Sequence, residues 1–161
     1  MSNQIQFLRE SIKGRIADMV FERMMRDDPC HTFTVVPYGY EYTLPELAQY
    51  REFIKETPEL ARIHRSPDFL LIKQDKSRVF FVEVKYRKYF DFENILKWCT
   101  LIHETWPSAY LFLATQNGFY FDSCEEVISN HGKMKKLDSE IISTEIQKEY
   151  LSVLKEYIKI K

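Results

Sequence analysis

Apolar side chains recur at helical spacing near both ends of the chain. Within residues 14–25 they fall three or four positions apart, at Ala17, Val20, Phe21 and Met24. A second series covers about residues 139–160, with Ile142, Ile146, Tyr150, Val153, Leu154, Tyr157 and Ile158. Because side chains three and four residues apart share one side of an α-helix, the pattern predicts two amphipathic helices.

Shorter apolar runs, rich in β-branched and aromatic residues, predict five β-strands. They cover about residues 32–36, 69–73, 78–85, 109–115 and 118–123, and the first is expected to continue past Pro37. A further helix is predicted over residues 91–106, where Pro107 ends it. This order of elements indicates an α/β fold in which helices cover a sheet.

The segment between the first two predicted strands favours a helical insertion at about residues 43–64. Thr43 has the side chain of an N-cap, Pro45 suits the first turn, and Glu46 lies three residues after Thr43, as in a capping box. The later stretch TPELARI predicts another short turn. We therefore expect a helical excursion on the surface of the sheet.

Length and composition predict a single domain over residues 1–161. The chain has 161 residues, 45% of them hydrophobic, and only four Gly and six Pro, which leaves little room for a linker. Its N-terminus lacks an apolar leader region and no stretch is apolar enough to span a membrane, so we expect a soluble, cytoplasmic protein. Three widely spaced cysteines, Cys30, Cys99 and Cys124, are expected to be reduced, buried thiols. A net charge of −1 excludes a protein that is basic all over, so any nucleic-acid contact must be a local patch.

Charged residues interrupt the apolar runs of residues 65–88. If residues 74–77 form the loop of an antiparallel hairpin centred on that loop, Asp68 faces Glu83. The apolar pairs in the same register are Phe69 with Val82, Leu70 with Phe81, Leu71 with Phe80 and Ile72 with Val79. Both faces of the hairpin are then apolar, which indicates central strands covered on each side. Lys85 lies two positions after Glu83, on the same face and about 7 Å along the strand, so three charged side chains converge.

This cluster has the composition of a metal-dependent phosphodiester hydrolysis site. Two opposed carboxylates at the end of a covered sheet repel each other and lose solvation. A divalent cation compensates, and two carboxylates with water suit Mg²⁺ or Mn²⁺. The Lys85 ammonium could polarise or deprotonate a water, or stabilise charge on a phosphate. A salt bridge without catalytic role is the alternative, because Asp followed by Glu-x-Lys is a loose pattern, but Pro67 before Asp68 and the intervening hairpin favour catalysis.

The stretch SPDFLLIKQDKSRVFFVEVKY resembles the PD-(D/E)XK, or restriction-endonuclease-like, nuclease superfamily, which includes archaeal Holliday junction resolvases. The resemblance covers about residues 13–115 and implies a central mixed β-sheet flanked by helices, with an αβββαβ core. It implies that Asp68 and Glu83 bind magnesium and that Lys85 assists the nucleophilic water, so that all three are catalytic. Many members act as homodimers, so a homodimer is also implied.

A third metal ligand is expected on the first helix, where resolvase-like members often carry a Gly-x-x-x-Glu pattern. Gly14 and Asp18 have this spacing, with Asp in place of Glu. We predict Asp18 as the ligand, and a solvated acid bordering the apolar face is the alternative. Glu22 lies further round the helix toward two arginines, which favours a solvated ion pair. Glu41, on a stretch expected to be β-like, is a further alternative.

The leading hypothesis is a Mg²⁺- or Mn²⁺-dependent endo- or exodeoxyribonuclease. Arg65, Arg87 and Lys88 flank the charged cluster and are predicted to contact the DNA backbone, unless they are only solvated strand ends. Recognition should use backbone and shape, because no helix-turn-helix or zinc-finger motif is present. The alternative is a nuclease-like fold that serves as a nucleic-acid- or protein-binding subunit without catalysis. The presence of Asp68, Glu83 and Lys85 together argues against it, because a binding module needs no opposed carboxylates.

Overall fold

A computed structural model describes residues 3–29 and 32–159 of the chain. The elements are α1 (Asn3–Arg26), β1 (Phe33–Pro37), α2 (Tyr40–Thr43), α3 (Pro45–Tyr50), α4 (Pro58–His64), β2 (Phe69–Lys73), β3 (Val79–Tyr86), α5 (Phe92–Thr105), β4 (Ala109–Thr115), β5 (Gly118–Ser123), α6 (Cys124–Ser129) and α7 (Thr144–Ile158). Cys99 and Cys124 are buried free thiols, as predicted, and Cys30 lies outside the described residues. None of the described helices has the length and apolar character needed to cross a membrane.

The strands form one mixed sheet in the order β1-β2-β3-β4-β5. β3 and β4 are parallel, and the other neighbours are antiparallel. α5 makes the long connection that a parallel pair requires. The predicted hairpin register is confirmed, since Phe69 lies opposite Val82 and Ile72 opposite Val79. The prediction of an α/β fold with a helix-flanked sheet is therefore confirmed.

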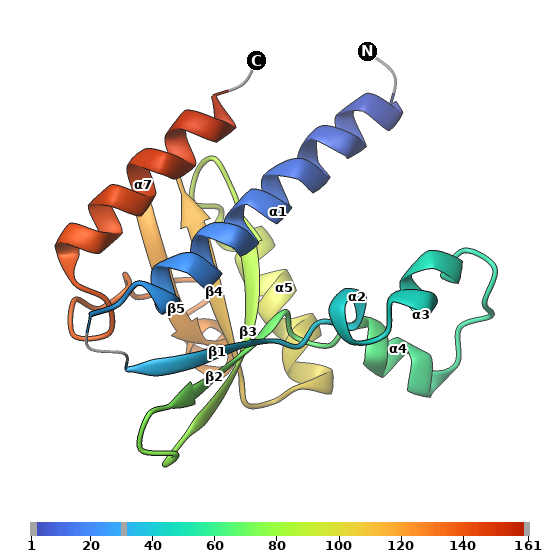
Figure 1. The fold of residues 1–161 in the computed structure, drawn as a ribbon. Coiled ribbons are helices and arrows are strands. Elements are labelled where there is room, and N and C mark those ends of the chain that lie inside the picture. Colours follow the sequence, from blue (N-terminus) through green and yellow to red (C-terminus); the bar gives the residue numbers. More distant parts are fainter. Residues whose placement is uncertain (1–2, 30–31, 160–161) are drawn as a thin grey trace.

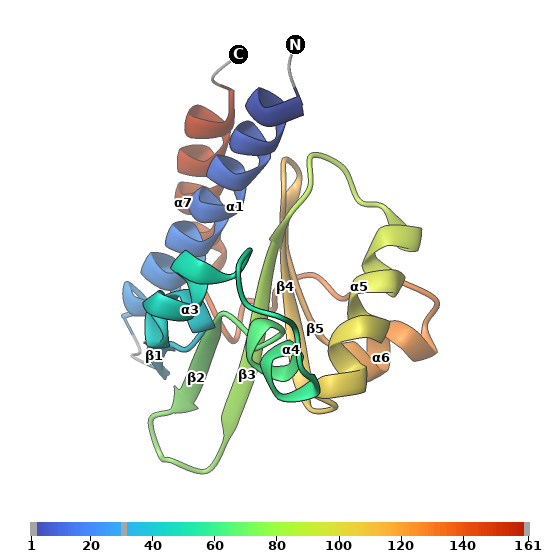
Figure 2. The ribbon, with the colours of Figure 1, turned by 90° about the vertical axis from the view of Figure 1, so that its right-hand side faces the viewer.

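Helices lie on both faces of the sheet (Figures 1 and 2). α1 and α7 lie side by side on one face, and α5 and α6 cover part of the other. The core beneath α1 centres on Phe21, whose ring lies 5.1 Å from that of Phe69 and 4.8 Å from that of Phe112. The core beneath α5 and α6 contains Cys99 and Leu111. β4 separates the two cores, and most of its residues are buried.

The prediction that β2 and β3 are covered on both faces is wrong for one face. Leu71 and Val82 point toward α1 and are fully buried, whereas Val79 is 45% exposed and Phe81 is half-buried. The reason is that α5 and α6 pack on β4 and β5. The open side of β3 carries Glu83, so incomplete coverage leaves room for a site.

The helical insertion between β1 and β2 begins earlier than predicted and projects away from the sheet (Figure 1). The chain turns into α2 at Tyr40 and does not continue as a strand after Pro37. Thr43 is not an N-cap: it ends α2, and its hydroxyl donates to the carbonyl of Gly39 at 3.3 Å. Leu44 precedes α3 without a side-chain cap. The Thr43 hydroxyl is thus used within its own helix, a common competitor of capping.

Other differences concern element lengths. α7 begins only at Thr144, after the N-cap Ser143 and later than the predicted start near residue 139. α6 was not predicted, because a six-residue helix is too short to show helical periodicity. It follows β5 directly, where the Ser123 side chain accepts a hydrogen bond from the N–H of Glu126.

Candidate active site

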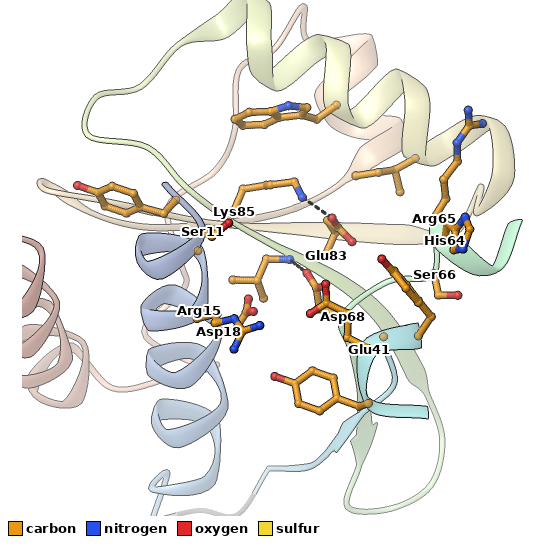
Figure 3. A pocket seen from close by; sticks show the side chains of 18 of the residues that line it. Ser11, Arg15, Asp18, Glu41, His64, Arg65, Ser66, Asp68, Glu83 and Lys85 are labelled. Carbon is orange, nitrogen blue, oxygen red and sulfur yellow. Dashed lines mark hydrogen bonds and ion pairs between the residues drawn. The ribbon is translucent and has the colours of Figure 1, made fainter. Parts of the chain in front are cut away.

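A cleft of about 610 Å³ opens on the partly covered face of β3. β3 and the residue after it form its floor, while α1, the insertion and α5 form its walls. Figure 3 shows Asp18, Asp68, Glu83 and Lys85 near one another in this space. The predicted residues that line it are Asp18, Arg65, Asp68, Glu83, Lys85 and Arg87. The fold therefore brings together residues that are far apart in the sequence.

Asp68 lies where β2 leaves the side of β3. β3 extends beyond Val82, its last residue paired with β2, so the following backbone groups of β3 lack a strand neighbour on that side. The Asp68 Oδ2 atom takes this place by accepting the N–H of Val84 at 2.8 Å. The Asp68 carbonyl in turn accepts the N–H groups of Tyr38 and Gly39, at 2.9 and 3.0 Å. These bonds fix the carboxylate against the cleft floor.

Glu83 and Lys85 form an ion pair on the same face of β3. The Lys85 Nζ atom donates to Glu83 Oε1 at 2.5 Å. The Lys85 side chain is 34% exposed and the Glu83 side chain is 14% exposed. This agrees with the two-residue alternation of a strand. The ammonium is therefore held beside the carboxylates on the cleft floor.

Burial shifts the protonation of the charged groups in the cleft. Burial, and then the charges of Glu83 and Asp18, raise the pKa of Asp68 well above its usual range, although Lys85 and the Val84 N–H oppose this. Burial also raises the pKa of Asp18 to about 7, against the attraction of Lys85. For Lys85, burial acts to lower the pKa, but Glu83 and Asp68 outweigh it and the pKa is raised. Lys85 thus stays an ammonium at neutral pH, which favours charge stabilisation over deprotonation of water.

The carboxylates of the cleft have the chemistry that suits a divalent cation. A cation would relieve the repulsion that raises the pKa of Asp68. Mg²⁺ typically binds through one or two carboxylates and keeps several waters, and Asp68 and Glu83 match this donor set. Within the described residues, no group of three His, Cys, Asp or Glu side chains is arranged to hold a metal ion. Asp18 as third ligand therefore stays a prediction.

The three acidic residues considered as a third metal ligand differ in their position relative to the cleft. Asp18 points from α1 into the cleft, and its charge interacts with that of Glu83 (Figure 3). Glu22 accepts a hydrogen bond from Arg26 at 2.9 Å, outside the cleft lining. Glu41 lines the cleft, but it does so from α2 and not from a β-strand as expected. Position thus favours Asp18 and Glu41 over Glu22.

The predicted backbone-contacting residues differ in their placement. Arg65 and Arg87 line the cleft, from the end of α4 and from the residue after β3. Lys88 is exposed, and its ammonium lies 5.3 Å from the centre of the Tyr89 ring, outside the cleft lining. Any contact between Lys88 and DNA would therefore lie at the periphery.

Several cleft residues were missed by reasoning from the sequence. Arg15, Tyr42 and Trp98 all line the cleft. Arg15 precedes Asp18 by three residues on α1, so its helical spacing was a usable signal. Trp98 and Tyr42 had no such signal, because their places depend on how α5 and the insertion pack.

Known proteins offer no further guide to this cleft. No protein-family model matches the chain, and no curated protein is significantly similar to it. What the cleft can do must be inferred from its own residues.

Asp18→Asn should stabilise the metal-free protein in a pH-dependent way. Burial raises the pKa of Asp18 to about 7 in the folded protein, from the ordinary aspartate value of 3.8 that applies to the unfolded chain. The wild type therefore loses stability as pH rises from about 4 to about 7, because ionisation is easier in the unfolded chain. The variant has no carboxylate to ionise, so its free energy of unfolding should exceed that of the wild type by an amount that grows over this pH range. The difference should level off near about 2 kcal/mol, because the Asp18 carboxylate is only partly shielded from water. Melting curves in chelator at several pH values measure this, and an advantage that is equal at pH 4 and pH 8 would contradict it.

Proposed function

We propose that this protein is a metal-dependent nuclease that hydrolyses phosphodiester bonds in DNA. The observation that carries the proposal is the convergence of Asp68, Glu83 and Lys85 on the floor of one cleft. Two crowded carboxylates with an ammonium beside them suit an anionic substrate only when a divalent cation is also present. The proposal thus requires Mg²⁺ or Mn²⁺.

Each residue has a defined part in this proposal. Asp68 and Glu83 would hold the ion, which supplies Lewis acidity and neutralises charge on the phosphate when bound. The Lys85 ammonium would stabilise the extra negative charge that the phosphate gains as water attacks. Arg65 and Arg87 would bind neighbouring phosphates, because guanidinium groups suit phosphate oxygens.

The order of the elements also supports the proposal. α1, β1, β2, β3, α5 and β4 follow one another as in the αβββαβ core of PD-(D/E)XK nucleases, with α2–α4 inserted after β1. The resemblance implies metal-binding roles for Asp68 and Glu83, and the presence of both residues in one cleft supports the proposal. A restriction-endonuclease-like core and a homodimer that addresses two strands remain part of the proposal.

A cleavage assay tests the proposed activity. Single-stranded, duplex, nicked and branched DNA should be incubated with the protein in Mg²⁺, in Mn²⁺ and in chelator. We expect cleavage of at least one form with either metal and none in chelator. Glu83→Gln, purified in parallel, should lose the activity, which excludes a contaminating nuclease. DNA binding without cleavage in every condition would instead support a non-catalytic binding subunit.

A further inference from the structure

One wall of the cleft differs from the others because it is aromatic and apolar. α5 contributes Trp98, Leu101 and Ile102, whereas α1 and the insertion contribute mainly charged and polar side chains. Leu101 is 44% exposed although it lies beside the charged floor. These three α5 side chains offer no hydrogen bond or charge to a phosphate group, apart from the indole N–H, so they fit a different part of a substrate.

The aromatic wall carries a cation–π pair. The Arg87 guanidinium lies over the Trp98 ring, with its central carbon 4.4 Å from the ring centre. Arg87 also donates from Nη1 to the Tyr86 carbonyl at 3.1 Å, and its own N–H donates to the Ala114 carbonyl at 3.0 Å. The guanidinium is thus tied to the end of β3 as well as to the indole. A flat cation on an aromatic ring is a surface on which a nucleobase can stack.

The stack lies close to the catalytic floor. Arg87 follows Lys85 by two residues, which is about 7 Å in an extended chain. Both residues line the same cleft as Asp68 and Glu83. A nucleotide whose phosphate reaches the carboxylates can therefore place an adjacent base against this wall.

We propose that the cleft takes an unpaired nucleic-acid strand, with a base beside the scissile phosphate stacked on the Arg87–Trp98 pair. This inference rests on the proposed nuclease function and specifies its substrate. In an intact duplex both faces of an internal base are covered by its neighbours, so a single strand, a flap or a frayed end offers a base without the cost of extruding it from the duplex. Arg15 and Arg65 on the opposite walls suit the phosphates of such a strand.

A comparison of matched substrates tests the stack. One oligonucleotide should be offered as a single strand, as the same strand in a blunt duplex, and as a single strand with an abasic site next to the cleaved bond. We expect the wild type to cut the single strand at least about 10-fold faster than the duplex, and the abasic strand about 5- to 100-fold more slowly, the scale of one base–aromatic stack.

Variants assign the effect to the two residues. Trp98→Ala should slow cleavage of the intact single strand by about the same factor as the abasic site, and should have little further effect on the abasic strand. Trp98→Phe should keep part of the preference for the intact single strand over the abasic strand. Arg87→Lys should lose part of the same preference, because lysine lacks the planar guanidinium. Trp106→Phe serves as control, because Trp106 packs against Tyr38 and Phe81 and does not line the cleft. Melting temperatures of all variants identify any that are misfolded.

Different results would contradict the stacked base and the nuclease function. Equal cleavage of single strand and duplex, or an equal effect of Trp98→Ala on intact and abasic strands, would overturn the stacked base while leaving the nuclease intact. If no substrate is cut, the nuclease function fails, and fluorescence anisotropy of the same oligonucleotides still tests the stack. In that case, equal affinity for all three oligonucleotides would overturn it. Repeating the assay with the same sequence in RNA shows whether the sugar matters.

Discussion

Replacing Lys85 by Ala should reduce the cleavage rate at least about 100-fold, the usual scale for removing one group that stabilises developing charge. Lys85 is protonated and is held by Glu83 at 2.5 Å. An ammonium cannot bind a cation, so its loss should affect the chemical step more than metal affinity. Single-turnover rates at saturating metal measure the effect, and metal titrations by melting temperature should remain close to those of the wild type.

Two further variants make the Lys85 result specific. Lys85→Arg keeps a positive charge in the cleft and should recover part of the rate. Lys88→Ala removes an exposed cation that does not line the cleft, so it should only weaken DNA binding modestly, and more at low salt. Unchanged cleavage in Lys85→Ala, or an equal loss in Lys88→Ala, would refute the catalytic role of Lys85.

The core of the site was predictable because strand pairing is governed by simple geometry. Alternation and loop symmetry predicted Asp68 near Glu83, and the observed register agrees as far as Phe69 and Val82, the residues next to them. The same alternation put Lys85 on the face of Glu83, where the two form an ion pair. Such reasoning needs only two strands that are adjacent in sequence, so few assumptions enter it.

The walls of the cleft were less predictable because they depend on packing between distant segments. Trp98 reaches the cleft only because α5 covers part of its face of the sheet. Tyr42 and Glu41 lie on α2, where aromatic and β-branched residues had indicated a strand. In this segment the β-strand propensity of the residues did not decide the structure, because the chain turns into the helical insertion after Pro37. The half-open face of β3, which creates the cleft, follows from the position of α5 and not from the apolar pattern of β3.

Asp68→Asn should abolish the stabilisation of the protein by divalent metal. In the wild type, burial and the charges of Glu83 and Asp18 raise the pKa of Asp68, so a bound cation relieves an unfavourable arrangement. If the dissociation constant is about one hundredth of the metal concentration, binding adds about 2.7 kcal/mol, or about 5–10 °C in melting temperature. The asparagine can still accept the Val84 N–H, but it cannot supply an anionic ligand.

The pH dependence of the same measurement separates metal binding at Asp68 from weak binding elsewhere. Because the raised pKa means that Asp68 holds its proton to higher pH, metal must displace that proton, and the wild-type shift in melting temperature should grow as pH rises above the usual titration range of an aspartate. Asp75→Asn is the matched control, since Asp75 is an exposed aspartate in the loop of the same hairpin whose side chain accepts hydrogen bonds from Ser77 within the turn. Asp75→Asn should show the same metal-induced rise in melting temperature as the wild type. The two-carboxylate site would be refuted by a wild type that millimolar Mg²⁺ and Mn²⁺ do not stabilise, or by an Asp68→Asn variant that is stabilised as strongly as Asp75→Asn.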